Sequence, residues 1–207
     1  CGAGKLLHVM SHLGYSHLEG VDPFIAEDLQ YKNGVRVFKK TVEEMKGEYD
    51  LVMLHHCLEH MPDPLSELEH VRRLLSPQGT LVVRVPLAQT FAWRKYGTDW
   101  VQMDPPRHMY LFSLAGIKLL AERAGFLVED VLFDSTELQF WGSEQYVRGI
   151  PLMAERSYRN SLRKSIFTVH DIMRFKRKAK ELNRGADGDQ ASFYLRCAEV
   201  NTGTCVS

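Results

Sequence analysis

The first residues of the chain have the types and spacing of a nucleoside-binding site. Cys1-Gly2-Ala3-Gly4 precedes a run with helical periodicity, and Asp22 closes the next short apolar stretch. Glycines let a backbone approach a ligand closely, the first turn of a helix offers unpaired N–H groups, and a carboxylate at a strand end accepts the hydroxyls of a ribose. The pattern predicts cofactor contacts from six residues: Cys1, Gly2, Ala3, Gly4, Asp22 and Pro23.

The spacing around these glycines separates one kind of cofactor from another. Asp22 follows Gly4 by 18 residues, close to the interval of about 20 between a glycine loop and its ribose carboxylate. A dinucleotide-binding G-x-G-x-x-G would need a third glycine where the chain has Leu7. The missing glycine argues against a cofactor with a pyrophosphate, such as NAD. A structural turn with a solvated Asp22 is the plainer alternative.

A second group of reactive residues follows the apolar stretch Leu51-Val52-Met53-Leu54. It reads His55-His56-Cys57-Leu58-Glu59-His60. Ligands of parallel α/β sheets bind beyond the carboxyl ends of the strands, so we expect Leu54 and His55 to line the cofactor and His56 to lie in the reaction site.

The segment from His56 to His60 also spells H-x-x-E-H, the pattern of one class of zinc protease. Zinc ligation in that class needs both histidines on one face of a long helix, whereas Pro62 and Pro64 interrupt this segment. Metal-dependent hydrolysis is therefore a remote alternative. The plainer interpretation is that Glu59 caps the next turn and His60 packs in a loop, with no metal bound.

Strand and helix patterns alternate along the chain. Apolar residues with helical spacing predict helices at 5–13, 24–31, 65–75 and 113–124, and β-rich or continuously apolar runs predict strands at 17–21, 35–38, 51–54, 80–85, 126–133 and 191–198. The run at 51–54 suits a strand buried on both faces. This alternation is typical of an α/β fold with a doubly wound, mostly parallel sheet. The long connection at 86–112 is rich in aromatic and polar residues, as functional loops often are.

The composition is that of one globular domain. The chain has 207 residues, of which 44% are hydrophobic and 25% charged, and its formal net charge is zero. Residues 156–184 nevertheless hold ten Lys or Arg and two Asp or Glu, against 16 basic and 24 acidic residues elsewhere. We expect a single domain over 1–207 with a basic helical insertion at about 143–187, before the last strand. The insertion is by default a solvated helical face. A lid for an anionic acceptor is the alternative, and nucleic-acid binding is disfavoured because aromatic residues for stacking are few.

Cysteine usage and hydropathy indicate a cytoplasmic protein without a membrane span. The four cysteines, Cys1, Cys57, Cys197 and Cys205, form no C-x-x-C pair, which favours a reducing compartment. No apolar run approaches the roughly 18 residues of a membrane-spanning helix, and the first residues lack the layout of a signal peptide.

Five segments in order resemble the class I S-adenosylmethionine-dependent methyltransferases, in particular the small-molecule group that includes ubiquinone-pathway and sugar methyltransferases. They are the glycine loop at 1–4, Val21-Asp22, the stretch from Tyr49 to Pro64, Leu74 to Leu81, and Pro106-Arg107-His108-Met109-Tyr110-Leu111-Phe112-Ser113. The resemblance implies a Rossmann-like fold and S-adenosylmethionine as cofactor, with S-adenosylhomocysteine as product. The first strand of the family, which is central in its sheet, is missing, so we expect the sequence to be a fragment of a longer chain.

The resemblance also implies a reaction: methyl transfer to a small-molecule acceptor, preferably to an oxygen of a sugar, a quinol or another metabolite. Such a transfer needs a base for the acceptor's proton, and we expect His108 to be that base, with Trp100, Arg107 and Tyr110 contacting the substrate. His108 as a structural residue that ties its loop to the sheet is an equal alternative. A non-catalytic nucleoside-binding or scaffold protein is the alternative function.

Some ubiquinone-pathway members of the group are associated with a divalent metal through Glu-x-x-Glu-His at the place of the H-x-x-E-H segment. In this chain His56 stands in the first position. A metal held by His56, Glu59 and His60 is therefore a minor alternative to a site without metal.

Overall fold

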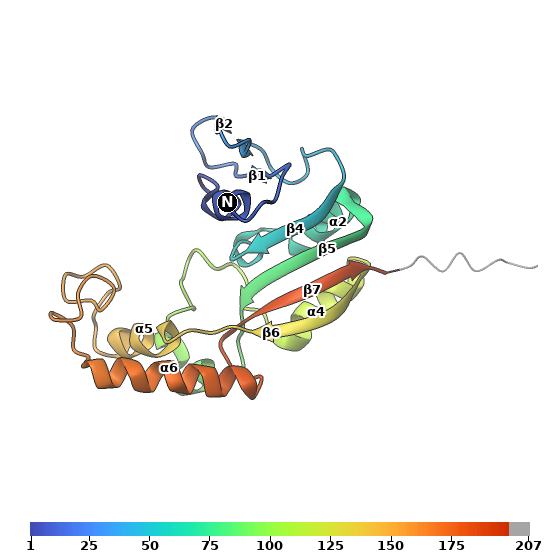
Figure 1. The fold of residues 1–207 in the computed structure, drawn as a ribbon. Coiled ribbons are helices and arrows are strands. Elements are labelled where there is room, and N and C mark those ends of the chain that lie inside the picture. Colours follow the sequence, from blue (N-terminus) through green and yellow to red (C-terminus); the bar gives the residue numbers. More distant parts are fainter. Residues whose placement is uncertain (199–207) are drawn as a thin grey trace, which may run out of the picture.

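The computed structural model describes residues 1–198, whose strands form two sheets (Figure 1). The smaller sheet has the order β1-β3-β2: β1 (Glu19–Val21) pairs in parallel with β3 (Arg36–Phe38), and β2 (Leu29–Gln30) is antiparallel to β3. The larger sheet has the order β4-β5-β7-β6 and contains β4 (Tyr49–His55), β5 (Leu75–Pro86), β7 (Gln190–Cys197) and β6 (Phe126–Phe133).

The larger sheet is mostly parallel, as the sequence predicts. β4 and β5 are parallel, while β7 is antiparallel to both of its neighbours, β5 and β6. Three of its strands therefore run in one direction, and β7 alone runs against them. Helices alternate with these strands, so the α/β class is confirmed.

Strand β4 forms one edge of the larger sheet, and no described strand pairs with its outer edge. The expectation that this strand is buried on both faces is wrong: Leu54 is buried, but Leu51 is 38% exposed. The apolar run alone suggested full burial, which also requires a neighbour on each side. Across the open edge lies the smaller sheet, with α1 (Lys5–His12) and the N-terminus (Figure 1).

Two helices cover one face of the larger sheet, α2 (Pro64–Leu74) and α4 (Leu114–Arg123) (Figure 1). Asp63 caps α2 by accepting a hydrogen bond from the Ser66 N–H, and Ser113 caps α4 by accepting one from the Gly116 N–H. The helix predicted at 113–124 is thereby confirmed, with Ser113 as its N-cap. Apolar side chains of both helices pack with β5, β6 and β7 into the main core.

The helix predicted for 24–31 is wrong. Turns and the short strand β2 occupy this segment. The Phe24 side chain, which would have had to face the core, is 95% exposed. Asp28 instead accepts a hydrogen bond from the Lys39 N–H, and the Lys39 ammonium donates to the Ala26 carbonyl. These contacts hold the segment against the chain that follows β3.

The connection at 86–112 contains a short helix that periodicity did not reveal, and two further helices lie in or next to the insertion. The connection holds α3 (Phe91–Tyr96) and the 3-10 turn η2 (Gly97–Asp99), and the two further helices are α5 (Leu138–Val147) and α6 (Val169–Arg184). One long amphipathic helix, α6, confirms part of the helical prediction for the basic segment, whereas 150–168 is mostly turns. A capping box between Thr168 and Asp171 begins α6.

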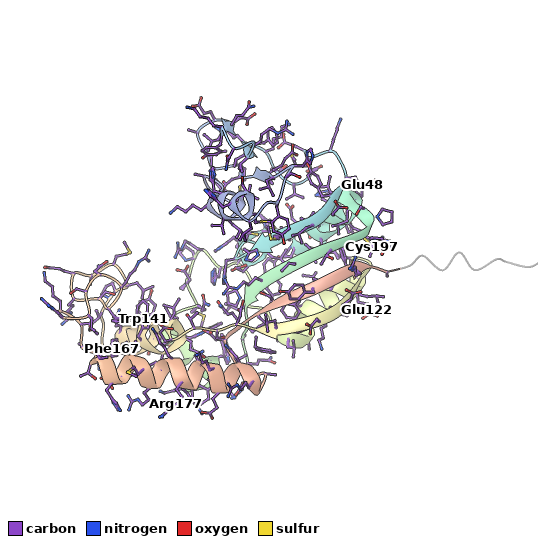
Figure 2. All side chains as sticks on the ribbon, viewed as in Figure 1. Glu48, Glu122, Trp141, Phe167, Arg177 and Cys197 are labelled. Atoms are coloured by element: carbon purple, nitrogen blue, oxygen red, sulfur yellow. The ribbon has the colours of Figure 1, made fainter. Side chains whose placement is uncertain are left out.

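α3, α5 and α6 enclose a second core rich in aromatic residues. The rings of Phe140 and Phe175 stack at 5.4 Å, and Trp141 contacts Tyr158 edge-on. Figure 2 shows Trp141 and Phe167 at this end of the molecule, far from Cys197 at the opposite end of the sheet. The insertion therefore has a core of its own beside the end of the sheet.

Two further sequence expectations concern the membrane and the cysteines. Within residues 1–198 we find no helix with the length and apolar character needed to cross a bilayer. Cys1, Cys57 and Cys197 are free thiols. Cys205 lies outside the described residues.

The buried carboxylate of Asp189 joins the second core to the sheet. It is 2% exposed and accepts a hydrogen bond of 2.9 Å from the indole N–H of Trp100. Burial raises the pKa of Asp189 to about 6, against the opposing hydrogen bonds from Trp100 and Ser135. Because the folded pKa lies above the ordinary value of 3.8, the native state prefers the protonated acid, and stability falls as the pH rises through that interval.

We predict that Asp189→Asn makes the protein more stable at pH 8 than the wild type, by at most about 3 kcal/mol. Asn keeps an oxygen for the Trp100 N–H and removes the buried charge. The advantage should shrink as the pH falls from 7 to 4, because the wild-type carboxyl is then protonated. Urea unfolding at several pH values measures it, with Asp187→Asn as control, because Asp187 is partly exposed and pairs with Arg94. An Asp189→Asn protein less stable than wild type at pH 8 would contradict the prediction.

Candidate functional site

The glycine loop and Asp22 meet at the end of β1. Asp22 Oδ2 accepts hydrogen bonds from the Gly2 N–H at 2.7 Å and from the amino group of Cys1 at 2.9 Å, and Oδ1 accepts one from the Phe24 N–H at 2.9 Å. Burial alone would raise the pKa of Asp22, but these hydrogen bonds lower it to about 2. The carboxylate is therefore ionised throughout the neutral range.

Gly2 and Gly4 have different roles in the loop that precedes α1. Both have left-handed backbone angles, with φ of 55° at Gly2 and 74° at Gly4, which begins α1. A Cβ on Gly4 would lie 2.9 Å from Val37 Cγ2, whereas one on Gly2 would meet nothing within 4 Å. Gly4 is needed for packing of the loop on β3, and Gly2 leaves its surface open beside Asp22. Ala3 and Pro23 are exposed on the same surface.

Strand β4 ends in residues with different environments. Leu54 is buried, His55 is exposed, and His56 has a left-handed φ of 48°. Burial and the nearby Arg84 lower the pKa of His55. Non-glycine residues with such a φ are uncommon and are held there by their surroundings. Here the His56 N–H donates to the Arg84 carbonyl on the neighbouring strand.

The imidazole of His56 is held by its neighbours on both sides. Its Nε2 lies 3.0 Å from Arg84 Nη1, and its Nδ1 lies 3.4 Å from Glu59 Oε1. Arginine only donates, so Nε2 must be the acceptor and Nδ1 carries the hydrogen. The lone pair of His56 is therefore used by Arg84 in this arrangement, which makes His56 a positioning residue rather than a free base.

Sequence reasoning missed two residues that hold His56 in place. Arg84 on β5 forms an ion pair with Asp134 through Nε and Oδ2 at 2.7 Å, and Ser192 on β7 donates to the same oxygen at 3.1 Å. A signal was present in the sequence, since Arg84 is the one charged residue in the apolar run from 81 to 87. Its partner Asp134 could not be identified from spacing.

His108 and His60 face each other across Glu59. Glu59 lies in the 3-10 turn η1 (Leu58–His60), its side chain is fully buried, and neither carboxylate oxygen has a hydrogen-bond partner among the described residues. The expectation that Glu59 caps the next turn is therefore wrong, because Asp63 caps α2. The rings of His60 and His108 are 4.8 Å apart, and the potential ligand atoms of the three residues lie within 4.8 Å of one another.

The proton positions on His108 follow from its contacts. Its Nδ1 lies 2.7 Å from the Gln102 carbonyl and must donate, so the Nε2 of the neutral ring carries a lone pair. That Nε2 is 4.0 Å from Glu59 Oε1 and 3.9 Å from Asp104 Oδ2. Burial lowers the pKa of His108, against the opposing Gln102 hydrogen bond and Glu59 charge. His108 is therefore neutral near pH 7 and able to accept a proton.

The three predicted substrate residues have different placements. Trp100 is fully buried and donates to Asp189, so it supports the loop from inside rather than forming an open wall. Arg107 is exposed, pairs with Asp104, and accepts a hydrogen bond from His60 Nδ1 at its carbonyl. Tyr110 is 39% exposed and donates to the Pro62 carbonyl. Arg107 and Tyr110 are thus close to the histidine pair through the backbone of their own loop.

The helix needed for zinc-protease chemistry is not formed by the H-x-x-E-H segment. His56 follows the last residue of β4, and His60 is the last residue of the three-residue 3-10 turn η1. His56 Nε2 also faces Arg84, a cation. The remote hydrolase alternative has no support from this geometry.

A cavity of about 490 Å³ lies between α3, α5 and α6. Phe91, Phe140, Phe167 and Phe175 provide its aromatic lining, and five Lys or Arg and three Asp or Glu provide its charges. Its lining includes none of Glu59, His60 and His108. The basic insertion therefore forms a pocket separate from the histidine pair.

Comparison with known proteins shows the family. A model described as a methyltransferase domain matches residues 1–131. Ubiquinone biosynthesis O-methyltransferases of Pseudomonas aeruginosa (strain LESB58) and Pseudomonas paraeruginosa (strain DSM 24068 / PA7) are 30% and 32% identical over 151 residues. Each match covers 64% of this chain and 64% of the relative, so the chain spans less than two thirds of these curated relatives.

Solved structures show the same fold at low sequence identity. The StiE O-methyltransferase has a TM-score of 0.55 and 13% identity over 97% of this chain and 66% of that one. A methyltransferase of Thermotoga maritima, described as a possible histamine N-methyltransferase, has a TM-score of 0.50 and 18% identity over 90% and 74% of the two chains. Together with the family model, these findings show that the chain belongs to the class I S-adenosylmethionine-dependent methyltransferases.

Proposed function

We propose that this protein transfers a methyl group from S-adenosylmethionine to an oxygen of a small-molecule acceptor and releases S-adenosylhomocysteine. The observation that carries the proposal is the proximity of the glycine loop to the turn that follows β4. The two strands that end at these segments are in contact, because the Tyr49 hydroxyl at the start of β4 donates a hydrogen bond of 2.6 Å to the Glu19 carboxylate at the start of β1. The nucleoside site and the histidines therefore face one region at the carboxyl ends of the strands.

The residues at the glycine loop fit this cofactor. An ionised Asp22 accepts hydrogen bonds from a ribose, Gly2 leaves room for close approach, and Leu54 and His55 border the next strand end. The cofactor supplies a methyl group on a positively charged sulfur, which an oxygen nucleophile attacks. The names of the Pseudomonas relatives support oxygen as the acceptor atom.

His108 is the proposed base for the acceptor's hydroxyl. Its neutral Nε2 lies between the carboxylates of Glu59 and Asp104, which stabilise the imidazolium that forms when the ring takes the proton. His56, held between Arg84 and Glu59, keeps the position of Glu59. Arg107 and Tyr110 border this region and are proposed to contact the acceptor, whereas Trp100 supports their loop.

An anionic group on the acceptor is a further part of the proposal. The cavity beside the insertion has two more basic than acidic residues, and Arg177 in it has no ion pair among the described residues. Arg177→Gln should weaken binding of a phosphorylated acceptor relative to its neutral analogue. Lys176→Gln, which breaks an ion pair with Glu137 outside the cavity, is the matched control. An affinity for the phosphorylated acceptor that is independent of salt would contradict this part.

Asp22→Asn should weaken binding of S-adenosylmethionine and S-adenosylhomocysteine by about 10- to 100-fold, because a charged hydrogen bond to the ribose is lost. Isothermal titration calorimetry measures both affinities. Asp28→Asn is the control, since Asp28 also accepts a backbone N–H but lies away from the glycine loop. Equal affinities in wild type and Asp22→Asn would overturn the assignment of the nucleoside site.

His108→Gln should lower kcat by about 10²- to 10⁴-fold and leave the affinity for S-adenosylhomocysteine unchanged. A screen for labelled methyl transfer to sugars, quinols and nucleotide sugars identifies an acceptor on which to measure it. Because burial lowers the pKa of His108, wild-type activity should decline only below pH 6.5, as the ring becomes protonated. His12→Gln, on the exposed face of α1, is the control. Full turnover by His108→Gln would remove its catalytic role.

A binding function without catalysis is the alternative outcome of the same experiments. Tight binding of S-adenosylhomocysteine with no transfer to any acceptor would favour a nucleoside-binding scaffold. Binding of neither cofactor form would contradict both functions.

A further inference from the structure

One side of α6 presents apolar and basic residues to solvent. Five exposed residues follow one another at intervals of three or four along the helix: Val169, Met173, Lys176, Lys180 and Arg184. Because an α-helix completes a turn every 3.6 residues, this spacing places them along one side. The buried residues of α6 lie on the opposite side and pack in the second core. We call this row of five residues the outer face of α6; in Figure 1 the helix lies at the border of the molecule, with α5 on its inner side.

The outer face of α6 is separate from the cavity between α3, α5 and α6. None of its five residues lines the cavity, whereas Asp171 and Glu181, the two acidic residues of α6, both do. These carboxylates pair with Arg174 and Lys178, which also line the cavity. The negative charges of the helix are therefore directed to the cavity, and the outer face contains none.

Most of the positive charge on this surface is not neutralised. Lys180 and Arg184 have no ion pair among the described residues, and Lys176 has one, with Glu137 at 3.7 Å. Residues 156–184 hold ten basic and two acidic residues, against 16 basic and 24 acidic residues elsewhere. The charge of this neutral chain is therefore divided into a basic insertion and an acidic remainder.

Two apolar side chains are exposed within the basic surface. Val169 is 60% and Met173 64% exposed, one turn apart on the outer face. Nucleic acids are bound by basic residues together with aromatic side chains that stack on the bases, and the outer face has no aromatic residue. A membrane surface uses both kinds of residue that are present, because anionic lipids attract Lys and Arg and the region below the headgroups accepts apolar side chains.

We propose that the outer face of α6 binds the surface of an anionic phospholipid bilayer. The helix lies along the surface, with Val169 and Met173 in the interface and the ammonium of Lys180 at the lipid phosphates. No refolding is required, because the second core already holds the opposite side of α6. The acidic remainder of the chain is repelled by the same lipids, which orients the molecule with its insertion toward the bilayer. This attachment does not depend on the proposed reaction.

The test is co-sedimentation of the full chain with vesicles, without cofactor or acceptor. Vesicles of phosphatidylcholine with about one third phosphatidylglycerol should bind the protein, and vesicles of phosphatidylcholine alone should not. Binding should decrease as the salt concentration is raised from about 0.1 M to about 1 M, because the lipid charge is screened. Lys180→Gln and Arg184→Gln should each weaken binding about fivefold, and Met173→Ser about threefold or more.

Lys118→Gln and Leu119→Ser are the matched controls, because these two residues are also exposed but lie on α4. Neither should change binding, and all five variants should keep the Tm of the wild type, since every substituted side chain is exposed. The proposal is overturned if anionic vesicles bind no more protein than neutral ones, or if the α6 variants bind as tightly as the controls.

Single-stranded DNA of mixed sequence separates lipid from nucleic acid as the partner. Binding of the DNA that is lost in Lys180→Gln, with no binding of anionic vesicles, would overturn the proposal and assign the outer face to a nucleic acid. Because no turnover is measured, each of these results leaves methyl transfer and the role of His108 to the tests of the proposed function.

Discussion

The ion pair between Arg84 and Asp134 determines the arrangement at the carboxyl end of the larger sheet. Arg84 lies in an otherwise apolar part of β5, where a guanidinium without partners would be unfavourable. Its partners come from three other segments: Asp134 after β6, His56 after β4, and Ser192 of β7 through the shared Asp134 oxygen. One half-buried cation thereby fixes the ends of all four strands relative to one another.

The position of Glu59 follows from this arrangement. His56 is held by Arg84 in a left-handed backbone conformation, and the chain then turns through η1 so that Glu59 points inward. The loop at 86–112 folds over it, because the Met109 and Tyr110 N–H groups donate to the Glu59 carbonyl. His108 reaches the same place through this contact. A carboxylate and two histidines are thus brought together by backbone hydrogen bonds more than by side-chain pairing.

The insertion supports the site by packing against the loop that carries His108. Its core of stacked aromatic rings packs α6 and α5 against α3, which lies in the same loop as His108. Asp189, just before β7, holds Trp100 of that loop from inside. Burial raises the pKa of Asp189, so this link between loop and sheet weakens the native state as the pH rises. Such a contact is retained where the position of the loop matters more than its stability.

Local sequence patterns were enough to predict the elements that depend only on residues close together in the chain. Alternation of apolar runs with periodic segments predicted the α/β class, strand β6 with its observed bounds and the helix at 113–124 that corresponds to α4, and the glycine-loop spacing placed Gly2 and Asp22 in one site, where they are hydrogen-bonded. These features depend on propensity, capping and backbone freedom within a few residues, or on a spacing typical of the family. The helix predicted at 24–31 failed because Leu29 pairs with β3 as part of β2, and the segment packs on the small core beneath α1 in this extended form, with Phe24 left exposed.

Only the tertiary structure decided which reactive side chains share a site. His56, Glu59 and His60 are adjacent in sequence, yet Arg84 takes the lone pair of His56, and His108 comes from another loop to face Glu59 and His60. Asp134, Asp189 and the buried state of Glu59 were equally invisible to pattern. The physical reason is that burial and pairing of charges depend on contacts between residues far apart in the chain, which no local periodicity records.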